Sequence, residues 1–526
     1  MSKQIIFALA LTLSFIFMPT AQSSADPTTI VYSFPVNVGP GNPHLYLPNQ
    51  VFMQQMIYDK LVSYGKGGVI EPCLAESWDV SEDGLTYVFH LRKDVKFSDG
   101  EPFNAEAAVK NFDTIMLNRK RHGWQEITNK LEKWEAAGEF DLKLTLNSPY
   151  ANTMNDFAAF RPYRFLSPKA FPDSGFTADG IKAPIGTGPW KLTETVPNEY
   201  NLFERNDLYW GPKPQAEKVL IKVIPDPLTR AVALETGEID LIYGSGQIGF
   251  DVFDRFSKDP KYVTSISDPL LNNVVALNTG RFPTNDKAVR LALNYITNRD
   301  EIIQGLYLGH LQPAYFLCNK VFKYCDLDLK PYPFDVELAA KTLEEAGWIL
   351  PPGQTIREKD GKKLDVPFSF ISTDATHKSV VEAMQAQAKK AGINIIALGE
   401  EADIYLSHNR EGNFNMVLID TYSAPLEPVA SLSAMRSPTN TDHQAQAGLP
   451  QKAQIDELIG KMVSSVKEED IANYVKEILT FFHDEAVYVP LIGVSIIEVH
   501  RKGELDNVTF DTDNNHIAFE KMIKLK

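Results

Sequence analysis

Histidine and cysteine are the residues of this chain best suited to catalysis or metal binding, and the sequence holds ten of the first and three of the second. No two histidines stand four positions apart, and no G-x-S-x-G turn is present to expose a nucleophilic serine. One G-x-G-x-x-G match, GSGQIG at 244–249, follows a strand-like segment, but no helical pattern with small residues comes after it. We therefore expect a protein that is not an enzyme and has no resident cofactor.

The N-terminal residues indicate the compartment in which the cysteines lie. An apolar run from Ile5 to Phe17 follows a lysine and is too short to span a bilayer comfortably. Ser23 and Ala25 occupy the −3 and −1 positions of a cleavage site, so we predict a signal peptide over 1–25, with a single anchor helix as the alternative. No cysteine lies near this site, which excludes a lipid anchor there and favours a Gram-negative periplasm.

An odd number of cysteines in an oxidising compartment predicts one disulfide and one free thiol. Cys318 and Cys325 share the short segment LCNKVFKYC, whereas Cys73 stands alone near a proline. We predict a disulfide between Cys318 and Cys325. A zinc site is the weaker alternative, because two thiolates without nearby paired histidines do not supply four ligands.

The length and charge of the chain restrict its architecture and its partners. A sequence of 526 residues exceeds the size at which one hydrophobic core stops growing, so at least two lobes are expected. The formal net charge of −16 disfavours nucleic acid and anionic membrane surfaces as partners.

The secondary-structure elements expected to hold the candidate residues alternate between short strands and helices along the chain. Residues from Thr86 to Leu91 alternate at the strand period, and Asn104 can cap a helix whose apolar residues share one face. Asp335 caps a second helical run, Val366 to Ser372 is typical of a strand, and Ser379 to Lys390 is typical of a helix. The pattern predicts an α/β fold.

Two extended, β-branched segments, 264–278 and 487–494, are candidates for strands that cross between lobes. If they do, both ends of the chain build the first lobe, the middle builds the second, and a ligand binds in the cleft between the lobes. The expected divisions are 26–268 for the first part of lobe I, 269–490 for lobe II and 491–526 for the return to lobe I.

Several long segments resemble the periplasmic binding proteins for peptides, opines and nickel that serve ABC importers. The resemblance covers nearly the whole chain after residue 25 and implies the large two-lobed fold of that family, but it does not determine the ligand. The segments that carry it are LAESWDVSEDGLTYVFHLRKDVKFSDGEPFNAEAAVKNF (74–112), APIGTGPWKL (183–192), RNDLYWG (205–211), IPDPLTRAVALETGEIDLIYG (224–244) and AVRLALNYITNRDEII (288–303).

Within that family the chain looks like the nickel-binding branch. Peptide binders carry a buried aspartate for the ammonium group of the peptide, and Ala424 occupies the matching position here, which would leave that charge uncompensated. The segments typical of the nickel branch are FPVNVGPGNPHLYLPNQ (34–50), NRKRHGW (118–124), FRPYRF (160–165), MRSP (435–438) and HDEAVYVP (483–490).

The resemblance implies a cleft that holds a metal already bound by a small carboxylate or histidine chelate. Arg161 matches the arginine that binds ligand carboxylates, and Arg121 matches a second one, because a planar guanidinium offers parallel donors. Trp124, Tyr405 and Tyr422 match aromatic cleft positions that can enclose a flat chelate. An arginine or aromatic residue without such a match is more often a surface or core residue.

The chain also departs from the branch. Asn440 replaces the histidine that ligates nickel, and a neutral amide is a poorer ligand for nickel than imidazole. Leu426, Leu47 and Val51 replace a tyrosine and two small or thioether cleft residues, so direct ligation by the protein is in doubt.

Two interpretations of the departures remain open. His443 and His516, the latter beside Asn515, could supply replacement metal ligands. Alternatively, the chelator fills every coordination position and Asn440 donates a hydrogen bond to its carboxylate, in which case Arg436 and Asn440 suit an opine-type metallophore.

The resemblance therefore implies a periplasmic, monomeric substrate-binding protein that delivers a nickel chelate to the permease of an ABC importer. An opine-type metallophore or a short peptide is the alternative ligand.

Overall fold

The computed structural model describes residues 28–45, 51–423, 425–511 and 516–525. The predicted signal peptide over 1–25 lies outside the described residues. Within those ranges, no helix combines the length and the apolar character needed to cross a membrane.

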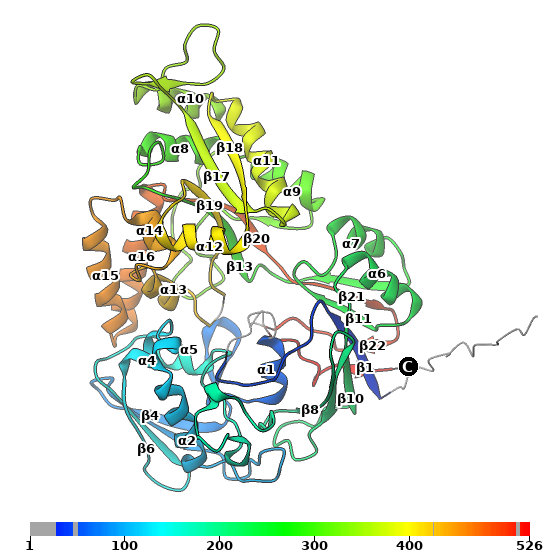
Figure 1. The fold of residues 1–526 in the computed structure, drawn as a ribbon. Helices are drawn as coiled ribbons and strands as arrows, with labels where there is room; N and C mark the ends of the chain where they lie inside the picture. Colours follow the sequence, from blue (N-terminus) through cyan, green and yellow to red (C-terminus); the bar gives the residue numbers. More distant parts are fainter. Residues whose placement is uncertain (1–27, 46–50, 424, 512–515, 526) are drawn as a thin grey trace, which may run out of the picture.

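The first lobe is built around a mixed sheet of seven strands, in the lower right of Figure 1. Strand β1 lies at its centre and pairs in parallel with β10 and β11, while the remaining pairs are antiparallel. In the order β12-β21-β11-β1-β10-β9-β8, the strands are Tyr262–Ile266, Ile497–Arg501, Leu241–Gly244, Thr29–Phe34, Lys218–Val223, Tyr200–Arg205 and Trp190–Val196.

A second, four-stranded sheet with the order β4-β5-β7-β6 forms the lower left of this lobe (Figure 1). The predicted strand over 86–91 is confirmed as β5, and its residues Tyr87, Phe89 and Leu91 point into the core. The predicted helix cap is confirmed too, because the Asn104 side chain accepts a hydrogen bond from the Ala107 backbone at the start of α2. The strands are Ala75–Val80, Thr86–Leu91, Asp141–Leu146 and Leu131–Ala136.

Short helices and two-stranded pairs complete the first lobe. The helices are α1 (Val51–Ile57), α2 (Ala105–Leu117), α3 (Arg119–His122), α4 (Glu126–Lys130), α5 (Thr153–Ala158), α6 (Pro227–Thr236) and α7 (Phe250–Ser257). The pairs are β2 (Val62–Tyr64) with β3 (Ile70–Pro72), and β22 (Leu505–Asp506) with β23 (Ile523–Lys524).

The second lobe holds a six-stranded sheet, in the upper half of Figure 1. In the order β14-β20-β13-β19-β17-β18, its strands are Gln312–Pro313, Tyr488–Val494, Leu271–Leu277, Met416–Asp420, Asp365–Ile371 and Asn394–Glu400. Its helices are α8 (Lys287–Ile296), α9 (Arg299–Tyr307), α10 (Val336–Glu345), α11 (Ala375–Lys389), α12 (Ala402–Glu411), α13 (Val429–Ala434), α14 (Thr441–Gln446), α15 (Lys452–Ser464) and α16 (Glu468–Asp484). A small hairpin joins β15 (Glu358–Lys359) to β16 (Lys362–Lys363).

Local capping explains the helices of this lobe. Asp335 caps α10 as predicted, by accepting a hydrogen bond from the Leu338 backbone. Helix α11 begins four residues earlier than predicted, at Ala375, because Asp374 accepts a hydrogen bond from the His377 backbone and starts the helix there.

The predicted α/β fold with two lobes is confirmed by these sheets and helices.

Two adjacent connections join the lobes. Strand β12 ends at Ile266 in the first lobe and β13 begins at Leu271 in the second, so 264–278 is two strands rather than one. The chain returns after Val494, four residues beyond the expected division at 490, because β20 stays paired with β13 up to Leu271. The connections bond to each other, since the Ser267 backbone donates to the Ile496 carbonyl oxygen at 2.9 Å.

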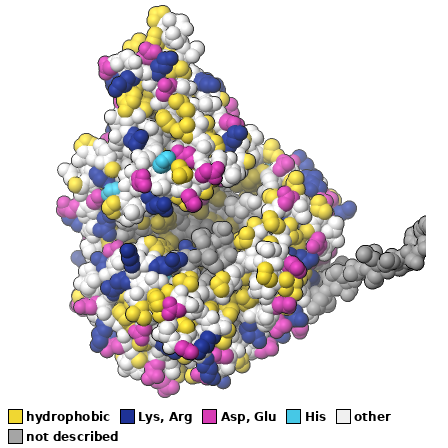
Figure 2. Space-filling view, in the orientation of Figure 1, with side chains coloured by type: hydrophobic (Ala, Val, Ile, Leu, Met, Phe, Trp, Pro, Cys, Tyr) yellow, Lys and Arg dark blue, Asp and Glu magenta, His cyan; other side chains and the backbone are white. Residues whose placement is uncertain are grey.

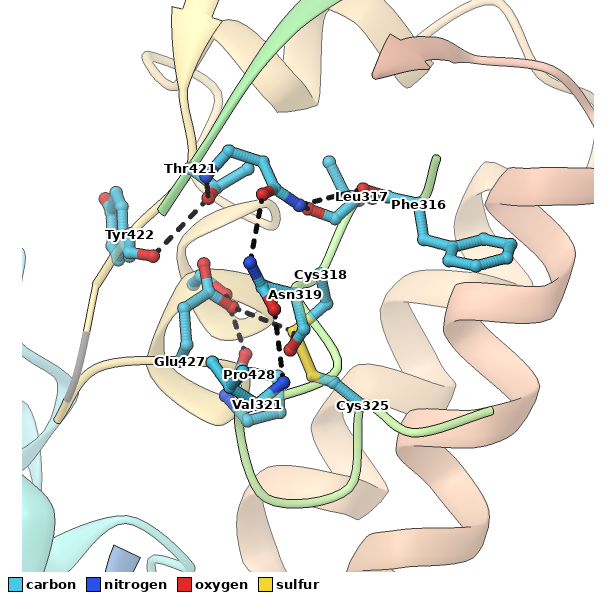
Figure 3. Close-up of a disulfide and its surroundings, with 12 residues drawn as sticks. Phe316, Leu317, Cys318, Asn319, Val321, Cys325, Thr421, Tyr422, Glu427 and Pro428 are labelled. Carbon is cyan, nitrogen blue, oxygen red and sulfur yellow. Dashed lines mark hydrogen bonds between the residues drawn. A yellow bond between two sulfur atoms is a disulfide. The ribbon is translucent and has the colours of Figure 1, made fainter. Parts of the chain in front are cut away.

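The predicted disulfide between Cys318 and Cys325 is confirmed, and Cys73 is a buried free thiol. Figure 3 shows the disulfide beside Glu427 and Pro428, and the Cys318 sulfur lies 3.7 Å from Glu427 Oε2.

Candidate ligand-binding cleft

A cavity of about 450 Å³ lies between the two lobes, with one wall from each. Figure 2 shows a hollow across the middle of the molecule, with Lys and Arg side chains on its rim at the left of the view. The first lobe supplies Gly123, Trp124, Gln125, Glu126, Asn129 and Tyr150, and the second supplies Tyr422, Ala430, Ser433, Ala434, Arg436, Ser437, Thr439 and Asn440.

Two arginines predicted for the site, Arg121 and Arg161, lie near the Trp124 wall of the first lobe, although neither is among the residues that line the described cavity. The Arg161 guanidinium carbon lies 5.9 Å from the centre of the Trp124 ring, so two residues predicted from separate segments are neighbours. Burial, together with the positive charges of Arg121 and Arg161, lowers the pKa of His122 to about 4. Because a positive potential disfavours an imidazolium ion, this pKa indicates that both guanidinium groups act on the same region.

The two arginines of the FRPYRF segment have different surroundings. Arg164 is 1% exposed, and its guanidinium donates to the backbone oxygens of Tyr58 at 2.7 Å and Phe160 at 3.0 Å. Arg164 therefore holds the FRPYRF segment in place through backbone hydrogen bonds in the protein interior. Arg161 is half-buried and lies beside the aromatic rings of Phe160 and Trp124, the second of which lines the cavity.

The wall from the second lobe combines an aromatic ring with nitrogen donors. Burial and the nearby carboxyls of Asp442 and Glu427 raise the pKa of Tyr422 to about 12, so its hydroxyl keeps its proton. The Asn440 side-chain oxygen caps α14 by accepting a hydrogen bond from the Asp442 backbone at 2.7 Å. Since the oxygen is engaged, the amide nitrogen is the atom that can donate to a ligand.

Arg436 lies at the junction of the two walls. Its Nη2 atom donates to the Ser433 hydroxyl at 3.1 Å, within its own lobe, and lies 3.8 Å from Glu126 Oε1 of the first lobe. Glu126 was not among the residues predicted from the sequence. Its position directly after the HGWQ segment, at the first residue of α4, was the available signal, because acidic residues favour helix N-termini.

Tyr405 is a correction to the predicted site. It is 6% exposed, its hydroxyl donates to the Leu418 backbone oxygen at 3.0 Å, and it packs in the hydrophobic core. Its side chain is needed inside the second lobe, because a buried hydroxyl requires a partner, and it is not part of the cleft wall.

His516 is a second correction. Burial alone would lower its pKa, but hydrogen bonds to Asp511 at 2.8 Å and interaction with Glu520 outweigh burial and raise the pKa to about 9. A protonated imidazole with a carboxylate at each ring nitrogen has no lone pair for a metal. His443 is not among the residues that line the described cavity, and its Nδ1 atom lies 3.2 Å from the Met435 backbone oxygen.

The remaining predicted positions do not contribute to the described cavity. Val51 and Leu426 are 8% and 6% exposed and pack within the protein. Leu47, Asn515 and Ala424 lie outside the described residues. No group of three or more His, Cys, Asp or Glu side chains in the described ranges could hold a metal ion.

Two buried carboxyl groups stand behind the wall of the second lobe. Glu427 accepts a hydrogen bond from the Ser431 hydroxyl at 2.8 Å, and burial raises its pKa to about 8 (Figure 3). Asp442 accepts one from the Tyr488 hydroxyl at 2.9 Å, and burial raises its pKa to about 6. Both groups lie near Tyr422; at pH 6 the folded protein holds Glu427 largely neutral and Asp442 about half protonated.

A larger cavity of about 630 Å³ lies beside the connections between the lobes. The 244–249 segment, which matched a nucleotide-binding pattern, forms part of its wall, and no lysine or arginine is among its lining residues. Asp251 and Asp420 line it instead, so this end of the cleft does not suit the phosphates of a nucleotide.

Comparison with known proteins accounts for this architecture. The profile of the bacterial extracellular solute-binding proteins, family 5 Middle, matches residues 69–443. The chain is similar to the nickel-binding periplasmic protein of Escherichia coli (strain K12), with 45% identity over 525 residues, 100% of this chain and 99% of that protein. It is 25% identical over 477 residues to heme-binding protein A of Haemophilus influenzae, covering 85% of this chain and 84% of that protein.

A solved structure shares both lobes. The crystal structure of NikA from Brucella suis in complex with Fe(III)-EDTA superimposes with a TM-score of 0.92 at 46% identity, covering 94% of this chain and 99% of that one. These findings agree with a cleft that binds a solute. The chain belongs to the bacterial extracellular solute-binding proteins of family 5 and is a transport protein rather than an enzyme.

Proposed function

We propose that this chain is the periplasmic substrate-binding protein of an ABC importer and that it binds nickel as a complex with a small chelator. The observation that carries the proposal is the cavity between the lobes, where Trp124, Tyr422, Arg436 and Asn440 come together. The similarity to a nickel-binding periplasmic protein along the full length supports the choice of metal.

The chemistry of the walls favours a chelate over a bare ion. Nickel binds imidazole, thiolate and carboxylate groups, and Glu126 is the single side chain of these kinds that lines the described cavity, beside guanidinium and amide donors and aromatic rings. Such donors bind the carboxylates of an organic chelator, and flat rings enclose its surface. The candidate chelators are histidine, a small carboxylate or a metallophore.

An opine-type metallophore is the second candidate. Arg436 and Asn440 both line the cavity and can donate to the carboxylates that such a molecule carries. A short peptide is the weaker alternative, because the residue at the position of the ammonium partner, Ala424, has no charge.

Closure of the lobes supplies the mechanism. Ligand contacts to both walls favour the closed arrangement, and the paired connections at 267–270 and 495–496 are the proposed hinge. The closed surface is then presented to the permease, which works with the ATPase of the importer. We propose that the protein acts as a monomer.

A thermal-shift panel tests the class of ligand. Nickel with histidine, citrate or EDTA should raise the melting temperature by mass action, and nickel alone should do so less. A dipeptide that produced the sole shift would contradict the proposal.

Calorimetry of Arg161→Ala tests the site. Loss of hydrogen bonds between a guanidinium and a carboxylate should weaken chelate binding by about 1.5 to 3 kcal/mol. Arg255→Ala is the matched control, because Arg255 is an exposed arginine on α7 that pairs with Glu235. Equal affinity in both variants would remove Arg161 from the site.

A further inference from the structure

Glu126 and Arg436 form an ion pair between the lobes inside the proposed binding cavity. Glu126 Oε1 lies 3.8 Å from Arg436 Nη2, and both residues line the same cavity of about 450 Å³. Their side chains are 24% and 30% exposed, so solvent reaches both charges. The separation exceeds that of a hydrogen bond, so the attraction is mainly Coulombic and can be displaced.

Each partner is held in place by its own lobe. Arg436 is fixed through the hydroxyl of Ser433, one turn earlier in α13, at 3.1 Å. Glu126 lies 3.5 Å from Lys130, which donates to the Ser148 hydroxyl at 2.9 Å. The carboxylate therefore remains in the cavity wall when Arg436 binds another anion.

A carboxylate in this position would oppose the binding of the proposed ligand. The neighbouring charges of Arg121, Arg161 and Arg436 attract an anion, and Glu126 repels it from the same wall. Both the attraction to the arginines and the repulsion from Glu126 grow with each negative charge on the ligand, so Glu126 offsets part of the advantage that the arginines would give to highly charged anions.

We propose that Glu126 selects ligands by their charge: it occupies Arg436 as an internal anion and lowers the affinity for chelates with more than one net negative charge more than the affinity for neutral ones. The inference rests on the proposed function. It names Glu126 as a specificity-determining residue and a weakly charged metal chelate as the ligand class.

Calorimetry of Glu126→Gln with three probes of different charge tests the proposal. The probes are Ni(II) bis-histidine, which is neutral, Ni(II) citrate, with one negative charge, and Ni(II)-EDTA, with two. The substitution should change the affinity for the neutral complex less than about two-fold and raise that for Ni(II)-EDTA about five-fold, the scale of a solvent-exposed ion pair. High salt should reduce the gain.

Two further variants keep the result interpretable. Glu457→Gln removes an exposed carboxylate that pairs with Lys461 on α15, and it should leave all three affinities unchanged. In Arg436→Ala the added effect of Glu126→Gln should shrink, because the two residues are coupled.

The outcomes separate the two proposals. An equal change for all three chelates, or a larger change for the neutral one, would overturn charge selection while leaving the proposed function intact. Failure of the wild-type protein to bind any of the three would overturn the proposed function and this inference with it.

Discussion

Replacement of Glu427 by glutamine should change the dependence of stability on pH. The Glu427 carboxyl is 6% exposed, and its Oε2 atom lies 3.7 Å from the Cys318 sulfur. The Cys318 sulfur belongs to a disulfide and has no proton to donate (Figure 3). The main side-chain donor to the Glu427 carboxyl is therefore the Ser431 hydroxyl. Burial therefore raises the pKa of Glu427 from its ordinary value of 4.5 to about 8.

The direction in which the free energy of unfolding changes with pH follows from the protons that the folded and unfolded states bind. Below pH 4.5 the carboxyl is neutral in the folded and unfolded protein, and it contributes its full stability. Between pH 4.5 and 8 the unfolded chain loses this proton while the folded protein keeps it, so the free energy of unfolding falls as pH rises. Each pKa unit corresponds to about 1.4 kcal/mol, which limits the total loss to about 5 kcal/mol.

Glutamine is neutral throughout this range. Glu427→Gln should be less stable than the wild type by about 1 kcal/mol at pH 4.5, because its amide N–H groups gain only weak acceptors beside the disulfide. At pH 9 it should be more stable than the wild type by several kcal/mol. Urea denaturation followed by tryptophan fluorescence from pH 4.5 to 9 measures the difference.

A control isolates the buried group. Glu468→Gln removes an exposed carboxylate that pairs with Lys323 of the same disulfide-closed loop, and its curve should run parallel to that of the wild type. If the Glu427→Gln curve were also parallel, the carboxyl would be ionised in the folded protein, and the reasoning from burial would be refuted.

Two further predictions concern the second lobe. Replacement of Cys318 and Cys325 by serine should lower the stability by about 2.5 kcal/mol, the entropy of closing so short a loop, as measured by urea denaturation; unchanged stability would contradict this. Asn440→Ala should lower stability by about 1 kcal/mol through loss of the α14 cap and also weaken chelate binding, whereas Asn440→Asp should keep the cap and weaken binding only; equal melting temperatures for both variants would argue against the capping role.

Local hydrogen bonds explain why the order of elements could be predicted. Asn104 and Asp335 cap their helices by bonding to backbone groups three residues away, so the information lies within one turn of sequence. The start of α11 was misplaced although Asp374 offered the same signal. The carboxylates that bind His516 were also visible in the local sequence, because Glu520 stands four residues after it and Asp511 five residues before it.

The roles of the candidate residues depend on contacts that no local pattern contains. The resemblance singled out Arg161, but no local pattern gives the different role of Arg164, because that residue donates to the backbone oxygen of Tyr58, far away in the chain. Tyr405 was assigned to the cleft, but its position on α12 directs it toward Leu418 of β19 in the core.

By itself, the sequence determined the α/β pattern, the disulfide and the resemblance to a solute-binding family, because capping, strand periodicity and cysteine spacing are properties of neighbouring residues. The tertiary structure alone decided which side chains share the cavity. Glu126 and Arg436 come from different lobes, and only the packing of one lobe against the other brings their charges within 3.8 Å.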